Sequence, residues 1–221
     1  MHPSAHVHPD REGLERAAAE IRLGHLVVIP TDTVYGVAAD PRDPAAVARL
    51  FAAKGRPRQL RVPVLVGDAA VAASLAAHLS EAARTLMDAF WPGPLSIVVR
   101  LAADAGLRLD PPGGPDAAPG SLQTVALRQP DHPQALALLA LTGPLAVTSA
   151  NLTSHPPART AAEAAAQLGD AVACYLDGGP TPGRTASSIV DCSKAAPRLL
   201  REGAVSLSDL ERALVRAGAR A

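Results

Sequence analysis

Short runs rich in valine, isoleucine and leucine alternate along this chain with alanine-rich stretches, and this alternation restricts the fold more than any other feature. A short β-branched apolar run predicts a strand, whereas apolar residues three or four positions apart predict a helix. The expected strands are 26–29, 62–66, 95–101, 124–128, 145–148, 172–176, 188–191 and 198–201. The expected helices are 10–23, 44–51, 69–77, 80–90, 132–141, 161–168 and 208–217. The pattern predicts an α/β domain, and the closely spaced late strands favour a twisted mixed sheet flanked by helices.

The length and composition predict one globular domain. A chain of 221 residues, with 48% apolar and 19% charged residues, has the composition of a folded protein and is long enough to bury a core. We expect a disordered tail over 1–9, a single domain over 10–205 and a C-terminal helix within 206–221. The proline- and glycine-rich stretch 102–121 is expected to be a long surface loop, and its composition makes it a candidate lid.

The charge balance and the cysteines restrict the kinds of partner and location. Lys plus Arg and Asp plus Glu number 21 each, which argues against a surface built to bind a nucleic-acid backbone but leaves room for a local basic cleft. Cys174 and Cys192 lie in or beside apolar runs without metal-ligand spacing, so buried reduced thiols and a cytoplasmic location are expected. No apolar run approaches the roughly 18 residues of a membrane span. The first residues are also too polar for a signal peptide.

Four polar segments lie where predicted strands and helices end, which is where a scaffold usually presents functional groups. They are residues 30–36, 54–58, 148–151 and 187–191. The second segment places Lys54, Arg56 and Arg58 close together, and three neighbouring cations suit a triphosphate or a carboxylate ligand. The alternative is a solvated basic turn that complements the dipole of the preceding helix.

Hydroxyl and amide side chains accompany these cations. Thr31, Thr33, Ser149 and Asn151 can hydrogen-bond phosphate oxygens, a ribose or the polar atoms of an amino acid, and they can equally cap helices or make turns. Neither a Walker phosphate loop nor a dinucleotide-binding fingerprint is present. An ATP site in this chain must therefore use a different phosphate cradle.

The order of these motifs resembles the YrdC-like threonylcarbamoyl-AMP synthase family, in its short single-domain form, over residues 13–203. The matching blocks are Pro-Thr-Asp-Thr-Val-Tyr-Gly at 30–36, Lys-Gly-Arg-Pro at 54–57, Trp-Pro-Gly-Pro-Leu-Ser at 91–96, a strand ending at Arg128, Ser149 with Asn151, Ser-Ser-Ile-Val-Asp at 187–191, and Leu-Arg-Glu-Gly at 200–203. Ser96 stands where the family usually has threonine. After Asn151 the chain has Leu152-Thr153-Ser154 in place of the usual x-Ser-Gly, and the strand after the basic block lacks the histidine found in many members.

The resemblance implies a catalytic domain over 10–205 with an open basic cleft. In the implied reaction, the amine of L-threonine takes up CO2 from bicarbonate, and the resulting carbamate attacks the α-phosphorus of ATP and releases pyrophosphate. The product, threonylcarbamoyl-AMP, is expected to pass to separate proteins that modify an adenosine of tRNA, with weak or no direct tRNA binding by this chain. Mg²⁺ is expected to arrive with ATP, because the sequence has no dense carboxylate cluster for a dedicated metal site.

Roles for individual residues also come from the resemblance. Lys54 and Arg56 are expected to be catalytic, and Thr31, Thr33 and Arg58 to bind threonine and bicarbonate. The residues expected to bind ATP are Lys54, Arg58, Thr124, Arg128, Ser149, Asn151, Ser187 and Arg201.

Two other functions are compatible with parts of the pattern. An RNA-binding module could use the same basic cleft without chemistry, although zero net charge and an aromatic content of 2% speak against it. A relative that forms carbamoyl-adenylate, as in hydrogenase maturation or antibiotic carbamoylation, would keep the fold and change the substrate. Such domains usually belong to longer chains.

Overall fold

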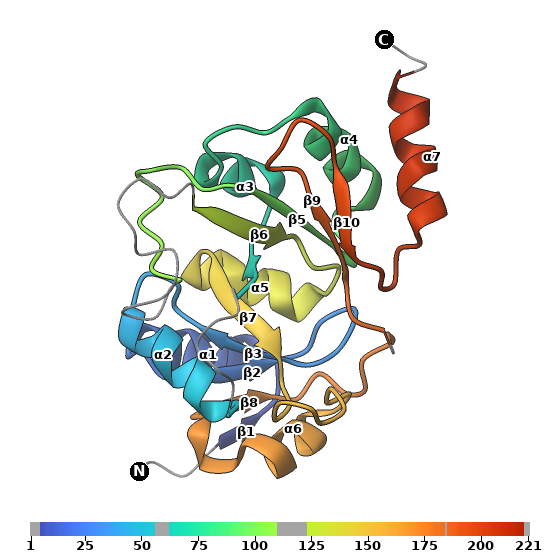
Figure 1. Cartoon of the computed structure of the whole chain (residues 1–221). Helices are drawn as coiled ribbons and strands as arrows, with labels where there is room; N and C mark the ends of the chain where they lie inside the picture. Colours follow the sequence, from blue (N-terminus) through green and yellow to red (C-terminus); the bar gives the residue numbers. More distant parts are fainter. Residues whose placement is uncertain (1–4, 56–61, 110–122, 184, 219–221) are drawn as a thin grey trace.

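The computed structural model describes residues 5–55, 62–109, 123–183 and 185–218, and these residues form a mixed sheet flanked by helices. The sheet has the strand order β1-β8-β2-β3-β7-β4-β6-β5-β9-β10 (Figure 1). The strands are β1 (Ala5–Val7), β2 (Val27–Ile29), β3 (Gly36–Ala39), β4 (Val64–Leu65), β5 (Leu95–Arg100), β6 (Thr124–Arg128), β7 (Leu145–Ser149), β8 (Cys174–Leu176), β9 (Ser188–Asp191) and β10 (Arg198–Arg201). Parallel and antiparallel pairs both occur, as the spacing of the late strands predicts.

The described residues contain seven helices, which pack on the sheet or, for the last of them, against a neighbouring helix. They are α1 (Arg11–Arg22), α2 (Pro44–Ala53), α3 (Ala69–Leu75), α4 (Glu81–Phe90), α5 (Pro133–Thr142), α6 (Ala161–Leu168) and α7 (Leu207–Gly218). Most begin at a side chain that accepts a hydrogen bond from a free N–H of the first turn. The caps of this kind are Asp10, Asp43, Asp68, Ser80 and Thr160. Such capping sets where each of these helices starts.

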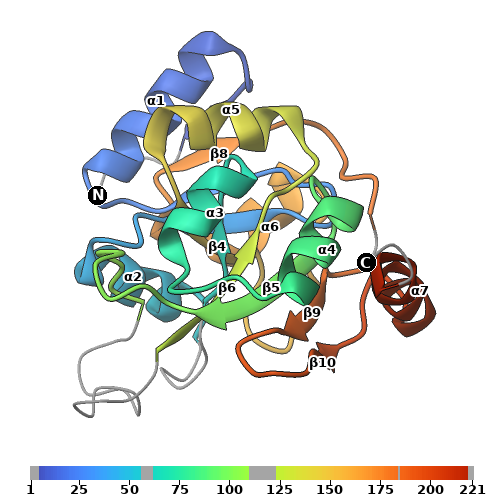
Figure 2. The same ribbon diagram turned by 90° about the horizontal axis from the view of Figure 1, so that it is seen from above.

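The core lies on both faces of the sheet and is built mainly from alanine, valine and leucine. Helices α1 and α5 lie side by side on one face (Figure 2). Apolar residues of α2 and α6 pack with β2, β3, β7 and β8 in a second cluster that includes the buried rings of Tyr35, Phe51 and Tyr175. A third cluster joins α3, α4 and α7 to β5 and β6. No helix in the described ranges is long and apolar enough to cross a membrane.

The expectation of a disordered tail over 1–9 is wrong for residues 5–7. Ala5–Val7 form β1, which pairs parallel with β8, and the ring of His6 stacks on Tyr175 with centroids 5.0 Å apart. Sequence reasoning misses this strand because its partner lies some 170 positions later in the chain, with Ala5 opposite Cys174.

Strand β3 is also absent from the sequence expectation, which treats residues 31–36 as a loop that leads directly to a helix. Its sequence, Gly-Val-Ala-Ala, has little β-branched content, yet all four residues are buried between β2 and β7. The other expected strands and helices are present with small shifts at their ends. Of the expected loop and candidate lid at 102–121, only residues 102–109 fall within the described residues, and 110–121 lie outside them.

Candidate active site

A cavity of about 450 Å³ opens where the ends of β2, β6 and β7 and the start of β9 meet. Its polar lining consists of Thr31, Thr33, Tyr35, Lys54, Ser96, Arg128, Thr148, Ser149, Asn151, Thr153, Ser187 and Arg201. The described lining contains three cationic side chains and neither Asp nor Glu. Such a lining favours an anionic ligand with several hydrogen-bonding oxygens.

The segment after β2 is a tight turn organised by Thr31. The hydroxyl of Thr31 donates to the main-chain oxygen of Val34 at 2.6 Å and accepts from the N–H groups of Thr33 and Val34 at 3.2 and 3.3 Å. Its oxygen also lies 3.0 Å from Oγ1 of Thr33. Thr31 therefore makes a turn as well as lining the cavity, and its contact with Thr33 fixes the direction of the second hydroxyl.

Tyr35 follows in the same segment and anchors the cavity wall to the chain beyond β8. Its hydroxyl donates to the oxygen of Gly179 at 2.7 Å and accepts from the N–H of Gly178 at 3.1 Å. Burial, reinforced by the negative charge of Asp177, raises the pKa of Tyr35 to about 12. The phenol therefore stays neutral and serves as a hydrogen-bonding anchor at ordinary pH.

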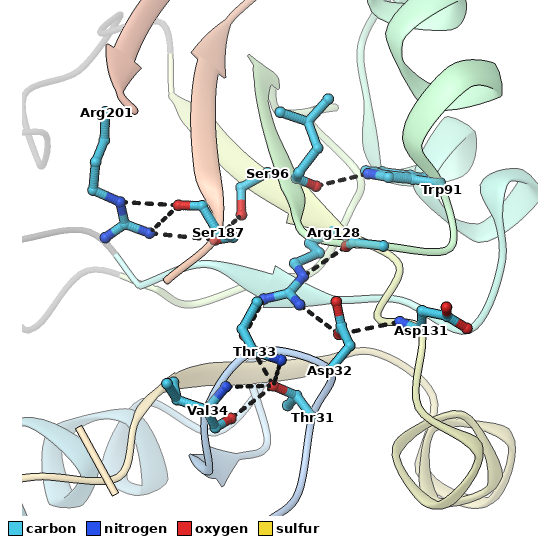
Figure 3. Close-up of polar contacts among 12 residues, drawn as sticks. Thr31, Asp32, Thr33, Val34, Trp91, Ser96, Arg128, Asp131, Ser187 and Arg201 are labelled. Carbon is cyan, nitrogen blue, oxygen red and sulfur yellow. Dashed lines mark hydrogen bonds and ion pairs between the residues drawn. The ribbon is translucent and has the colours of Figure 1, made fainter. Parts of the chain in front are cut away.

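Arg128 ends β6 and places a buried guanidinium on the cavity floor, with a residue exposure of 6%. Its Nε donates to the oxygen of Gly93 at 2.9 Å, Nη1 to Oγ1 of Thr33 at 3.1 Å, and Nη2 to Oδ1 of Asp32 at 2.5 Å (Figure 3). Burial lowers the pKa of Arg128, and the charge of Arg201 acts in the same direction, whereas Asp32 opposes it. A guanidinium remains charged under these conditions, so the site holds a fixed cation.

Lys54 caps the C-terminus of α2 and is 4% exposed. Its ammonium donates to the main-chain oxygens of Ser149 and Asn151, the latter at 2.7 Å, and to Oδ1 of Asn151 at 3.4 Å. The N–H and hydroxyl of Thr153 donate back to the main-chain oxygen of Lys54 at 3.0 and 2.9 Å. Helix α2 and the turn 149–153 are thus joined through both the main chain and the side chain of one lysine.

Asn151 also has a turn-making role. Its Nδ2 donates to the main-chain oxygens of Leu152 and His155, both at 2.8 Å, while Oδ1 faces Lys54. The interpretation that Ser149 and Asn151 shape a turn is therefore confirmed for Asn151, and both residues line the cavity at the same time.

Three further polar side chains of the lining form a chain of contacts. Arg201 donates from Nε and Nη2 to the main-chain oxygen of Ser187 at 3.1 and 2.7 Å, and from Nη2 to Oγ of Ser187 at 3.2 Å. Oγ of Ser187 lies 3.1 Å from Oγ of Ser96 (Figure 3). Ser96 is 1% exposed and lines the cavity. The motif at 91–96 pointed to this position, but no role followed from the residue type alone.

The fold brings most of the predicted site residues into one cavity. Those that line it are Thr31, Thr33, Lys54, Arg128, Ser149, Asn151, Ser187 and Arg201. Thr124 is placed elsewhere, at the start of β6 opposite Arg100 of β5, and is not among the described lining residues. Arg56 and Arg58 lie outside the described residues. Sequence reasoning assigned no role to Asp32, Tyr35 or Ser96, which the structure connects to the site by hydrogen bonds.

The described residues contain no group of three or more His, Cys, Asp or Glu side chains that could hold a metal ion. The cations and hydroxyls of the cavity suit phosphate or carboxylate oxygens. A divalent ion at this site would therefore depend on ligand oxygens for its coordination.

Comparison with known proteins agrees with this geometry. The family model Sua5_yciO_yrdC, described as "Telomere recombination", matches residues 19–203. A protein of Mycobacterium tuberculosis H37Rv, provisionally named threonylcarbamoyl-AMP synthase, is 47% identical over 194 residues, which cover 88% of this chain and 85% of that protein. Threonylcarbamoyl-AMP synthase of Bacillus subtilis is 37% identical over 199 residues, and the match covers 90% of this chain and 55% of that protein.

The fold also matches solved structures along nearly its whole length. The structure of Pyrococcus abyssi Sua5 complexed with L-threonine is similar with a TM-score of 0.83 and 33% identity, and the match covers 97% of this chain and 61% of that chain. This chain therefore corresponds to about three-fifths of the archaeal protein and to most of the mycobacterial one. By the extent of the family match and the identity to these relatives, the chain belongs to the Sua5/YciO/YrdC family.

Proposed function

We propose that this protein is a threonylcarbamoyl-AMP synthase, which converts L-threonine, bicarbonate and ATP into threonylcarbamoyl-AMP and pyrophosphate. The observation that carries the proposal is the cavity whose described lining combines Lys54, Arg128 and Arg201 with several hydroxyl groups and no carboxylate. The names of the mycobacterial and Bacillus relatives support the same activity. The protein is thus a nucleotidyltransferase of the threonylcarbamoyladenosine pathway of tRNA modification.

The reaction needs positioning and charge neutralisation more than covalent catalysis. The amine of threonine adds to CO2, an oxygen of the resulting carbamate attacks the α-phosphorus, and the bond to the leaving pyrophosphate breaks. Negative charge builds up on the departing phosphates, and fixed cations that already face that position lower the barrier. The described cavity supplies such cations without requiring a nucleophilic side chain.

Arg128 and Thr33 suit the amino-acid side of the cavity. Arg128 donates directly to Thr33, and its three hydrogen bonds to Gly93, Thr33 and Asp32 leave one N–H on each terminal nitrogen for a ligand. A carboxylate can accept two such donors. Sequence reasoning placed Arg128 with the nucleotide, but its contact with Thr33 favours the carboxylate of threonine. The archaeal relative was crystallised with L-threonine, which supports an amino-acid site in a fold of this kind.

Other polar residues of the lining suit the nucleotide. We assign Ser149, Asn151, Ser187 and Arg201 to ATP, because they line the cavity and present hydroxyl, amide and guanidinium groups. Lys54 contributes positive charge from behind the 149–151 turn. The proposal keeps Arg56 and Arg58 as contacts of the reacting phosphates and Thr124 as a nucleotide contact, on the strength of the family pattern.

Mg²⁺ is proposed to bind as the ATP complex. Oxygens of the triphosphate and water would supply its coordination, since no carboxylate lies among the described lining residues. The ion would supply charge neutralisation on the phosphates, while the side chains of this chain hold and orient the two organic substrates.

The product is an activated, hydrolytically labile adenylate, so we propose that it passes to separate proteins that transfer the threonylcarbamoyl group to tRNA. Direct tRNA binding by this chain is expected to be weak, because its formal net charge is zero.

One assay tests the proposal. The purified protein is incubated with ATP, Mg²⁺, bicarbonate and single amino acids, and pyrophosphate release and the adenylate product are measured, the latter by mass spectrometry. Threonine- and bicarbonate-dependent formation of threonylcarbamoyl-AMP is expected. A protein without threonine-dependent product would contradict the proposal. Adenylate formed from carbamoyl phosphate would favour the carbamoyl-adenylate alternative, and RNA binding without turnover would favour the RNA-binding module.

A further inference from the structure

Asp32 lies between two cavity residues but turns away from the cavity. Thr31 and Thr33 are part of the lining, whereas Asp32 is not among the described lining residues. Its side chain, only 12% exposed, points instead toward Arg128 and the main chain at Asp131 (Figure 3). A buried carboxylate in this position calls for a physical explanation, because burying a charge is costly unless it is paired.

The carboxylate of Asp32 joins the turn at 31–34 to the segment 128–131 through a single oxygen. Oδ1 accepts from Nη2 of Arg128 at 2.5 Å and from the N–H of Asp131 at 3.1 Å. The other oxygen, Oδ2, is buried and has no hydrogen-bond partner among the described residues. The charge of Asp32 is therefore balanced through Arg128, and the contact with Asp131 holds the carboxylate against the chain that leads into α5.

Arg128 needs this partner for its own orientation. Its other two partners, the oxygen of Gly93 and the hydroxyl of Thr33, are neutral, so Asp32 is the carboxylate that the described residues place against the guanidinium. Because the guanidinium is planar, contacts at Nε, Nη1 and Nη2 together fix the directions of its remaining N–H groups. Without the carboxylate of Asp32, Nη2 of Arg128 is no longer held in place.

We propose that Asp32 is a positioning residue for the amino-acid substrate: it holds Nη2 of Arg128 so that the remaining N–H groups of that guanidinium face the substrate carboxylate, without touching the substrate itself. The inference rests on the proposed function, which supplies an amino-acid substrate for Arg128. It gives the acidic residue of the Pro-Thr-Asp-Thr motif a task distinct from those of the two threonines beside it.

The test uses steady-state kinetics of the full chain. In Asp32→Ala the KM for L-threonine is expected to rise about tenfold or more, whereas the KM for ATP changes less than about twofold. Asp32→Asn, which keeps an oxygen for Arg128 but removes the charge, should give a smaller rise in the same KM. The matched control is Asp209→Asn, an exposed carboxylate of α7 beside Arg212, and both KM values should stay unchanged in it.

A double-mutant cycle separates positioning from a general structural effect. Arg128→Met should itself raise the KM for threonine, and adding Asp32→Ala should raise it no further if Asp32 acts through Arg128. The double variant also removes the unpaired buried charge, so its thermal midpoint should exceed that of Asp32→Ala. If Asp32→Ala alone does not fold, the double variant can still be compared with Arg128→Met, so the inference remains testable.

The outcomes distinguish this inference from the proposed function. A wild-type protein without threonine-dependent product contradicts the proposed function. Normal wild-type turnover with an unchanged KM for threonine in Asp32→Ala overturns the role of Asp32 alone. Additive increases of the KM for threonine in the double-mutant cycle would likewise overturn it, because they would show that Asp32 acts independently of Arg128.

Discussion

The ammonium of Lys54 lies 2.7 Å from the main-chain oxygen of Asn151 and 3.4 Å from Oδ1 of the same residue. One buried cation therefore holds a turn that forms part of the cavity wall and also adds positive charge behind it.

Replacing this cation should impair turnover. In Lys54→Met the alkyl chain is kept and the charge is lost, so the turn loses its tie to α2 and the developing pyrophosphate loses a stabilising charge. We expect the rate of pyrophosphate release at saturating substrates to fall about tenfold or more. The exposed Lys194 provides a matched control, and Lys194→Met should keep wild-type turnover. A Lys54→Met enzyme within twofold of wild type would show that this charge is dispensable.

Ser96 should contribute to substrate binding through Ser187. The two Oγ atoms lie 3.1 Å apart, and Ser187 also accepts from Arg201. Ser96→Ala removes one hydrogen bond worth about 1 kcal/mol, which corresponds to roughly a fivefold rise in the KM for ATP. Separate titrations of ATP and threonine measure the effect, with the exposed Ser74→Ala as the control. Identical ATP titrations for Ser96→Ala and wild type would refute this role.

Ser188 is expected to matter for stability. Its hydroxyl is fully buried, donates to the oxygen of Val205 at 2.6 Å and accepts from the N–H groups of Gly203 and Val205 at 2.9 and 3.0 Å. Ser188→Ala leaves these main-chain groups unpaired and should lower the free energy of unfolding by about 1–3 kcal/mol. Urea denaturation measures the change, and Ser74→Ala, which loses only an exposed hydrogen bond, should lie within about 0.5 kcal/mol of wild type.

The two cysteines predict a pH dependence. Burial raises the pKa of Cys174 and of Cys192 from 9.0 to about 11 each. The unfolded thiols ionise near pH 9, while the folded ones stay protonated. The contribution of the buried thiols to the free energy of unfolding is therefore complete below about pH 8 and is lost as the pH rises from about 9 to 11. Urea midpoints measured across this range should fall.

The same burial predicts slow thiol labelling. Neither Cys174 nor Cys192 should react readily with iodoacetamide at pH 8 in the native state, and both should react in urea. Mass spectrometry counts the labelled thiols. Rapid labelling of the native protein would contradict the burial of these side chains.

The sequence predicts the regular elements well where they have a strong local pattern. Strand β6 (Thr124–Arg128) matches its expected bounds because valine and leucine at alternating positions fill the core, where Val125 and Leu127 are each 1% exposed. Strands β1 and β3 are missed because neither has such a pattern. Their extended form depends on partners from distant parts of the chain, such as β8 for β1 and β7 for β3.

The sequence likewise predicts some of the site residues and misses others. Residues with a chemical group suited to an anion, such as Arg128 and Ser187, are found from the motifs alone. The role of Asp32 depends on which way its side chain points. Thr124, which is expected to contact the nucleotide, lies at the opposite end of β6 from Arg128 and is not among the described lining residues. The direction of a side chain, and the position of a residue along its strand relative to the cavity, can be determined only when the partners of that strand are known.

The hydrogen bonds that join distant parts of the chain at the cavity affect the order of events in folding. Lys54 and Asn151 are 97 positions apart in the chain, Asp32 and Arg128 are 96 apart, and Ser96 and Ser187 are 91 apart. Contacts of such long sequence separation form late, because the chain must close large loops before they are made. After dilution from denaturant, helical circular dichroism should therefore return before threonine binding does. The capacity to bind substrate is acquired only when the central strands of the sheet have assembled.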